Sequence, residues 1–99
     1  MSYSIILHPE AVAEITDAYS WYEERSKGLG NMFIDAINKR LTDIAQHPER
    51  YPKRKAPFRE ALVELFPYVI IYEFVKKEQA VFVSYVFHTK RNPRLKYKK

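Results

Sequence analysis

Apolar and polar positions alternate over the first residues and then change to a helical spacing. From Ser2 to Leu7, Tyr3, Ile5 and Leu7 share one side of the chain, which predicts a first β-strand. Pro9 suits the first turn of a helix, with His8 at its cap. Apolar side chains then recur every three or four residues, which predicts an amphipathic helix to about Ser26. These side chains are Val12, Ile15, Tyr19 and Tyr22.

A second helix is predicted after a short turn. Gly28 and Gly30 end the first helix. Apolar side chains then return at helical spacing from about Asn31, and Pro48 ends the pattern. They are Phe33, Ile37, Leu41 and Ile44. Because the connection is short, we expect an antiparallel helical hairpin whose apolar stripe packs on a sheet.

The second half of the chain predicts three strands. The segment from Pro48 to Pro57 holds three prolines and four cations and is expected to be an exposed loop. Residues 58–66 alternate, whereas residues 69–74 and 80–87 are apolar on both faces, as in strands covered twice. Short turns favour antiparallel pairing.

The predicted fold is a single α+β domain over residues 1–99, with the order β-α-α-β-β-β. The helical hairpin would pack on one face of a small, mainly antiparallel sheet. Two helices cover only one face, so we expect the opposite face to be apolar and uncovered until a partner docks there. Such a face would also permit a homodimer.

Composition narrows the class of protein. The chain has no cysteine, which excludes a disulfide framework and thiolate sites. The first residues lack the charged and apolar regions of a signal peptide. No apolar run approaches the roughly 20 residues of a membrane span. We therefore expect a cytoplasmic protein without a membrane partner.

Charge is distributed unevenly between the two halves. Residues 1–47 carry four Lys or Arg and seven Asp or Glu, whereas residues 48–99 carry thirteen and five. Cations cluster at Lys53-Arg54-Lys55 and again from Lys90 to Lys99. Clustered cations indicate a polyanion or an acidic protein surface as partner.

Candidate chemistry is sparse. His88 follows a predicted strand beside the cationic tail, where it could act as a general acid or base. A structural hydrogen bond from His88 to a neighbouring loop carbonyl is the favoured alternative. His8 and His47 stand at helix ends, where structural roles are expected. No metal-ligand spacing and no glycine-rich phosphate loop is present, so neither a metal nor a cofactor is expected.

Five short segments, spread over nearly the whole chain, resemble the RelE/ParE family of bacterial toxins. They are Trp21-Tyr22-Glu23, Gly28-Leu29-Gly30-Asn31-Met32-Phe33, Pro48-Glu49-Arg50-Tyr51-Pro52, Phe66-Pro67-Tyr68-Val69-Ile70-Ile71-Tyr72 and His88-Thr89-Lys90-Arg91-Asn92-Pro93. The resemblance implies the toxin of a type II toxin–antitoxin system, of the kind linked to plasmid stabilization, with a cognate antitoxin as partner. Operator DNA is normally bound by the antitoxin, so no direct operator binding is expected of this chain. Antitoxin-binding candidates are Phe66, Tyr68, Tyr72 and Phe82.

The resemblance leaves two activities open. Toxins of the RelE type are ribosome-dependent endoribonucleases that cut messenger RNA, a chemistry that needs cations around the phosphate. Where those toxins carry two arginines, this chain has Val69 and Thr89. A nuclease would therefore use another catalytic set. Its candidates are His88, Arg91, Arg59 and Tyr97.

The ParE branch inhibits DNA gyrase through a protein–protein contact and needs no general base. The long helical hairpin and the Phe66-Pro67-Tyr68 strand start favour this branch, in which the chain is not an enzyme. The target-binding candidates are Lys90, Arg91, Arg94, Lys96 and Tyr97. An inactive relative that still binds an antitoxin is a third alternative.

Overall fold

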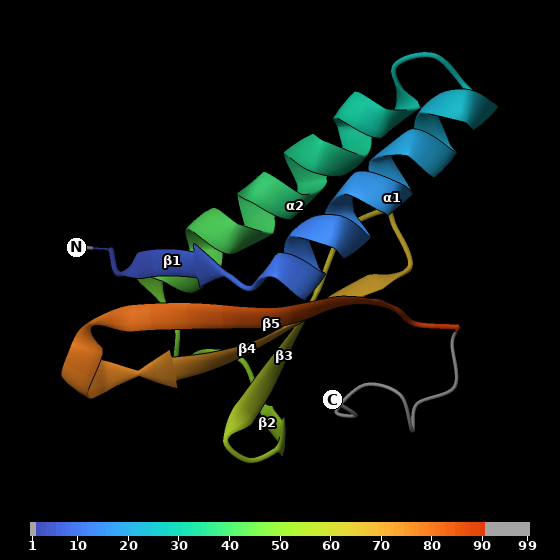
Figure 1. Cartoon of the computed structure of the whole chain (residues 1–99). Helices are drawn as coiled ribbons and strands as arrows, with labels where there is room; N and C mark the ends of the chain where they lie inside the picture. The colour runs from blue at the N-terminus through green and yellow to red at the C-terminus, as the bar shows by residue number, and fades with distance from the viewer. Residues whose placement is uncertain (1, 91–99) are drawn as a thin grey trace.

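The computed structural model describes residues 2–90, which form two helices and a five-stranded sheet (Figure 1). The helices are α1 (Pro9–Arg25) and α2 (Leu29–Gln46), and the strands are β1 (Ser4–Leu7), β2 (Lys53–Lys55), β3 (Phe58–Leu62), β4 (Tyr68–Val75) and β5 (Ala80–His88). A 3₁₀ turn, Lys76–Glu78, joins β4 to β5. Pro9 begins α1 with His8 at its cap, as the sequence predicts.

The sheet is mixed, with the strand order β1-β5-β4-β3-β2. β1 runs parallel to β5, and the other neighbours are antiparallel. Both helices lie on one face of the sheet, with α1 crossing above β5 (Figure 1). The predicted α+β fold, with a helical hairpin on one face, is confirmed.

The core fills the space between the hairpin and the sheet. β4 turns Ile70 and Tyr72 toward the helices, and α2 contributes Phe33, Ile37 and Ile44. All five are at most 2% exposed. Alternation along β4 and helical spacing along α2 place these side chains opposite one another, which is why both patterns are visible in the sequence.

Two glycines shape the hairpin in different ways. Gly28 has a φ of 90°, in the left-handed region that favours glycine. A Cβ on Gly30 would lie 2.8 Å from the backbone oxygen of Tyr19, so Gly30 allows the two helices to approach closely. The Glu23 carboxylate accepts hydrogen bonds from the N–H groups of both glycines, each at 3.0 Å, and satisfies donors at the start of α2.

Replacing Gly30 with alanine is expected to lower the free energy of unfolding by about 3 kcal/mol, because the added methyl group meets a backbone atom that cannot move alone. The matched variant Gly28→Ala has open space around its Cβ and is expected to lose only about 1 kcal/mol through backbone strain. Chemical denaturation of both variants tests this difference. Equal losses would show that close helix approach is not what Gly30 provides.

The expected loop between α2 and β3 contains a strand that the sequence did not predict. β2 pairs with β3, with Lys53 opposite Arg59 and Lys55 opposite Phe58. Its three side chains are all exposed. A strand with no buried face carries no apolar alternation, so its residues read as a loop. The strand expected over residues 58–66 is also shorter, since β3 ends at Leu62.

The face opposite the helices is not the open apolar surface that we expected. Val69, Ile71, Tyr85 and Phe87 form a second cluster there, each 5% exposed or less, with Phe58 packed against them. The argument for a homodimer through an uncovered face loses its basis.

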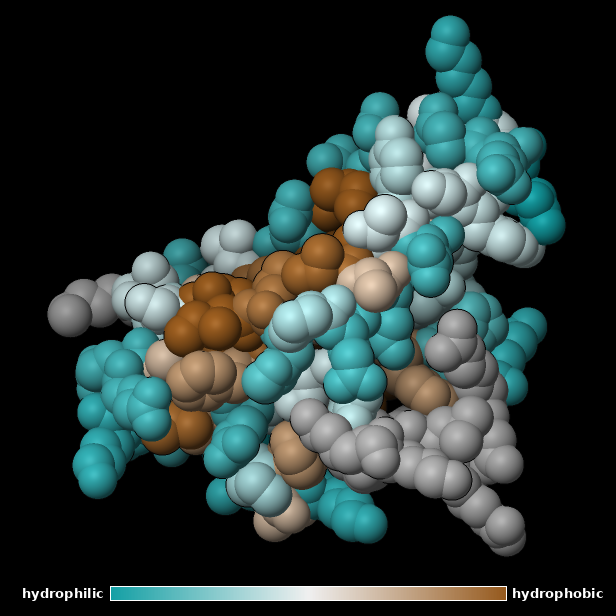
Figure 2. Space-filling model, viewed as in Figure 1, coloured by the Kyte–Doolittle hydropathy of each residue, from teal (hydrophilic) through white to brown (hydrophobic). Residues whose placement is uncertain are grey.

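Figure 2 shows another apolar surface, which runs over β1 and the adjoining parts of the helical hairpin. Two exposed side chains, Ile6 of β1 and Val12 of α1, contribute to the molecule's apolar exterior. Hydrophilic side chains border this stripe. Within residues 2–90, neither helix has the length and apolar character needed to cross a membrane.

Candidate functional site

A groove lies between α1 and the carboxyl-terminal end of β5. Its volume is about 640 Å³. We call it the α1–β5 groove. It is lined by Glu14, Asp17, Ala18, Trp21, Tyr22, Pro67, Tyr68, Val86 and His88. Acidic side chains of α1 thus face aromatic and imidazole rings from the sheet.

The groove exists because β1 is shorter than β5. Their pairing ends at Leu7 and Val83, after which the chain turns through His8 into α1. Helix α1 then crosses above the remaining part of β5 (Figure 1). A Glu14 carboxylate oxygen accepts a hydrogen bond of 2.7 Å from the backbone N–H of Val86 and ties the helix to this strand edge.

A group of stacked rings fixes the wall of the groove. Tyr22 of α1 packs edge-on against Phe66 and Tyr68, with ring centroids 5.0 and 6.4 Å apart. Phe33 of α2 contacts the same two rings at 5.3 and 5.2 Å. Burial raises the pKa of the Tyr22 hydroxyl, so this group stays neutral at ordinary pH.

His88 occupies the rim of the groove, and its Nδ1 accepts a hydrogen bond of 3.1 Å from the backbone N–H of Lys90. The proton of the neutral imidazole therefore lies on Nε2. The ring also packs edge-on against Tyr68, at a centroid distance of 5.0 Å. A local structural hydrogen bond, the alternative that the sequence favoured, is thus what His88 makes, although to a loop N–H rather than a carbonyl.

Arg59, another nuclease candidate, is directed to a different part of the molecule. Its guanidinium donates hydrogen bonds to the backbone oxygens of Tyr51 and Glu49, at 2.7 and 3.3 Å. Arg59 pairs with Tyr72 and His88 with Tyr68, on opposite sides of β4. Strand geometry places the two Cα atoms about 16 Å apart. The structure does not bring Arg59 and His88 together.

Arg91, Arg94, Lys96 and Tyr97 lie outside the described residues. Lys90 is described, and it is exposed directly after His88. Within residues 2–90, no group of three or more His, Asp or Glu side chains is arranged to hold a metal ion.

The four antitoxin-binding candidates do not share one surface. Phe66 and Tyr68 are half-buried in the ring group beside the hairpin. Phe82 lies on β5 opposite Glu73 and beside Ile6. Tyr72 is 0% exposed and donates a hydrogen bond of 2.7 Å to the Pro48 carbonyl, so it belongs to the core. Its side chain has no surface to offer a partner.

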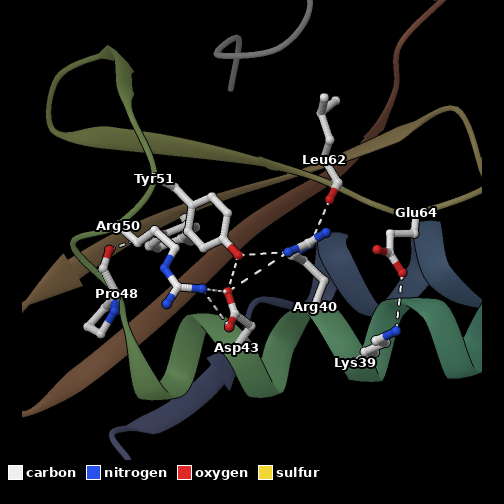
Figure 3. A network of polar contacts seen from close by, with 9 residues as sticks. Lys39, Arg40, Asp43, Pro48, Arg50, Tyr51, Leu62 and Glu64 are labelled. Carbon is white, nitrogen blue, oxygen red and sulfur yellow. Dashed lines mark hydrogen bonds and ion pairs between the residues drawn. The ribbon is translucent and has the colours of Figure 1, made fainter.

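A polar network on the other side of the hairpin holds α2 to the chain that precedes and follows β3 (Figure 3). The Tyr51 hydroxyl donates to Asp43 and accepts from Arg40 at 2.8 Å. Arg50 donates to both Asp43 oxygens at 2.9 and 3.0 Å, and Arg40 donates to the Leu62 carbonyl at 2.7 Å. These groups satisfy one another, which indicates a structural role.

Replacing Asp43 with asparagine is expected to lower the free energy of unfolding at pH 7 by about 2 kcal/mol, since hydrogen bonds to a charged group are lost. The Tyr51 hydrogen bond and then the Arg50 cation hold the pKa of Asp43 below its usual 3.8. This stability is present above pH 3.8 and is lost as pH falls through the lower folded pKa. Chemical denaturation of the parent and the variant at pH 7, and again well below pH 3.8, tests the sign of this pH dependence. Asp35→Asn, an exposed change on the same helix, is the control.

Sequence reasoning missed the acidic and aromatic wall of the groove. Glu14, Asp17 and Trp21 are spaced i, i+3 and i+7, so they share one face of α1. That spacing was available in the sequence. The local sequence pattern does not give the position of β5 beneath this face of α1, because that position depends on long-range strand pairing.

Comparisons with known proteins identify the family. The model of the family described as ParE toxin of type II toxin–antitoxin system, parDE, matches residues 5–93. The chain belongs to the ParE toxin family. No match is found among curated proteins. The predicted RelE/ParE relationship, closer to the ParE branch, is confirmed.

Solved structures share the fold of this ParE-family toxin at low sequence identity. The chromosomal ParDE toxin–antitoxin system from P. aeruginosa is similar with a TM-score of 0.77 and 14% identity, over 90% of this chain and 98% of that one. The isolated E. coli RelE toxin is similar with a TM-score of 0.69 and 19% identity, over 94% of this chain and 90% of that one. The E. coli RelBE toxin–antitoxin complex is similar with a TM-score of 0.69 and 16% identity, over 91% of this chain and 100% of that one.

Proposed function

We propose that this ParE-family toxin inhibits DNA gyrase through a protein–protein contact and that a cognate antitoxin neutralises it. The observation that carries the proposal is the separation of His88 from Arg59. Ribonuclease chemistry needs a proton-transfer group and a cation at the same phosphate. Arg59 instead donates to backbone carbonyls, and His88 accepts from the Lys90 amide. The ParE family match over residues 5–93 supports the same reading.

The target contact is assigned to the cationic tail. The proposed residues are Lys90, Arg91, Arg94, Lys96 and Tyr97. A block of five cations without an acidic residue, over residues 91–99, favours an acidic protein surface or a nucleic-acid complex as the target. An inhibitor of this kind needs a presented surface and no catalytic group.

An antitoxin partner is supported by the similar structures, which include ParDE and RelBE toxin–antitoxin systems. Of the proposed contacts, Phe66, Tyr68 and Phe82 remain, since each is only partly buried. Ribosome-dependent cleavage of messenger RNA is the second candidate function. The isolated E. coli RelE toxin shares this fold, so the nuclease is kept as the alternative.

Controlled expression in a bacterial host tests the target. We expect incorporation of labelled thymidine to fall before that of labelled methionine in the same culture, because replication is blocked first. Purified protein should also inhibit supercoiling by DNA gyrase in vitro. An earlier fall of methionine incorporation, together with intact gyrase activity, would support the nuclease instead.

His88→Gln separates the two candidate functions directly. As a general acid or base, His88 would contribute about 100- to 10,000-fold to an RNA cleavage rate. A gyrase inhibitor does not use it, so growth inhibition by the variant should stay within about two-fold of the parent. The dose of inducer that halves the growth rate measures the effect. Loss of toxicity in a folded variant would contradict the gyrase proposal.

A further inference from the structure

The two edges of the sheet differ in charge. Within residues 2–90, the sheet ends in β1 on one side and in β2 on the other. The β2 edge consists of Lys53, Arg54 and Lys55, all exposed, and cations on an edge strand oppose its pairing with another chain. The β1 edge, Ser4–Leu7, holds no charged residue. Of these two edges, only β1 is therefore suited to continue the sheet into another molecule.

Backbone groups on the outer side of β1 are directed away from the sheet. Ser4 and His8 donate their backbone N–H groups to carbonyls on the β5 side, at 3.3 and 3.0 Å. Successive residues of a strand alternate between facing one neighbour and facing the other. Ile5 and Leu7 therefore direct their N–H and C=O groups to the side of β1 that is opposite β5. These groups form a short template for a further strand.

The residues around this template restrict how a second copy can pair with it. Tyr3 also faces the outer side, but its N–H already donates to an α2 carbonyl at 2.8 Å. Pro9 has no N–H. An antiparallel pair centred on Ile5 would need the Tyr3 amide, and one centred on Leu7 would need an amide at Pro9. A pair centred on Ile6 places Ile5 of each copy opposite Leu7 of the other, so that each such pair exchanges both of its hydrogen bonds.

The same register brings exposed apolar side chains together. Ile5 and Leu7 pack against the core beneath the hairpin, so Ile6 between them points to the opposite face of the sheet. Ile6 is 44% exposed and lies beside Phe82 of β5. In a pair centred on Ile6, the two Ile6 residues are directly opposite each other, with Cα atoms about 4.5 Å apart. Together with Phe82 of each copy they form an apolar row across the extended sheet.

The helix face of the sheet supplies the rest of the contact. The twofold axis of an antiparallel strand pair is perpendicular to the sheet, so both helical hairpins lie on the same face. The apolar stripe in Figure 2 follows β1 and the adjoining hairpin. A groove of about 320 Å³ between β1 and α2 includes Ile5, Leu41 and Ala45 in its lining. A second copy would cover these surfaces, and a stable interface needs such additional area beyond a short strand pair.

We propose that two copies of this chain associate through the β1 edge, where β1 pairs antiparallel with itself about Ile6 and joins the two sheets into one. The contact is isologous because each copy supplies the same residues. It does not involve the second face of the sheet, whose cluster is buried within each copy. The inference goes beyond the proposed function and does not depend on the cellular target of the toxin.

Cysteine cross-linking tests the register, and the chain has no cysteine of its own to interfere. Ile6→Cys places two thiols at a Cα separation of about 4.5 Å, within the range of about 4.4–6.8 Å that disulfides span. Ser4→Cys changes an exposed residue of the same strand, but its two copies would be about 14 Å apart in this register. Under mild oxidation, we expect a disulfide-linked dimer from Ile6→Cys and none from Ser4→Cys on a non-reducing gel.

Sedimentation of the full-length protein over a range of concentrations measures the association itself. Ile6→Lys should raise the Kd of the dimer about ten-fold or more, since two opposed lysines repel and an apolar contact is lost. Leu65→Lys, the matched control, changes a side chain that is 89% exposed between β3 and β4, and it should leave the Kd unchanged. Melting temperatures check that both variants fold. Hydrogen exchange at the Ile5 and Leu7 amides should slow as the dimer forms, since these amides become paired.

Several results would overturn the proposal. They are a monomer at every concentration, a dimer that Ile6→Lys leaves intact, and cross-linking of Ser4→Cys as readily as of Ile6→Cys. Protection of the Ile5 and Leu7 amides only after an antitoxin is added would assign the β1 edge to another polypeptide, which also contradicts a dimer of this chain. None of these measurements reads gyrase or thymidine incorporation, so this proposal and the proposed function can fail separately.

Discussion

Replacing Tyr72 with alanine is expected to lower the free energy of unfolding by about 3–5 kcal/mol. Tyr72 is among the largest fully buried side chains, with no exposed surface. It lies on β4 between the sheet and the hairpin, packs edge-on against Tyr51 at 6.4 Å, and donates to the Pro48 carbonyl. A domain of this size has only about 5–15 kcal/mol of stability, so the variant should be partly unfolded at about 37 °C.

Tyr72→Phe separates the ring from its hydroxyl. The phenylalanine keeps the packing but leaves the buried Pro48 carbonyl without its partner, at a cost of about 1–3 kcal/mol. Urea denaturation of both variants and the parent measures the two contributions. A loss in Tyr72→Phe equal to that in Tyr72→Ala would assign the whole effect to the hydroxyl and contradict the core role of the ring.

The raised pKa of Tyr72 makes the stability of the fold depend on pH in the alkaline range. Burial raises the pKa of Tyr72 above its ordinary 10.0, and the charges of Tyr51 and Asp43 add to this, against an opposing effect of Arg59. The folded state thus holds the proton more tightly than the unfolded state does. This contribution is fully present below pH 10 and is lost as pH rises beyond it. The denaturation midpoint should fall above pH 10, and it should fall less steeply in Tyr72→Phe.

Most of the fold was predictable because its elements have one buried face. The 3.6-residue spacing of Phe33, Ile37 and Ile44 and the alternation along β4 both report burial against the same core. β2 was missed because its side chains are all exposed, so only its pairing with β3 defines it. The buried cluster on the second face was missed because it brings together residues far apart in the sequence, such as Phe58 and the β4 and β5 side chains.

The candidate site was less predictable than the fold, for a physical reason. His88 and Arg59 were grouped because their side chains suit RNA cleavage, but strand order places them on opposite sides of β4, opposite residues four apart along that strand. The groove depends on where β1 ends relative to β5, and β5 carries an irregularity opposite Ile71 and Tyr72 that shifts its register. Both are long-range properties, which local spacing does not encode.

Removing residues 91–99 is expected to weaken inhibition of DNA gyrase by about 10- to 1,000-fold, the range over which electrostatic steering changes association rates. The deletion removes Arg91, Arg94, Lys96, Lys98 and Lys99, and the formal net charge falls from +5 to zero. All the helices and strands described lie within residues 4–88, so circular dichroism of the truncated protein should retain the helix and sheet signals. A supercoiling assay over a range of protein concentrations measures the loss.

Charge and chain length are separated by a variant that keeps the tail but neutralises Arg91, Arg94 and Lys96 with glutamine. It should reproduce most of the truncation's effect, and raising the ionic strength should weaken the parent in the same direction. The control variant carries Lys76→Gln and Lys77→Gln in the turn at the opposite end of β5. That variant should inhibit gyrase as the parent does. If the truncated toxin still inhibits gyrase fully, the target contact lies elsewhere, and the surfaces of the helical hairpin become the next candidates.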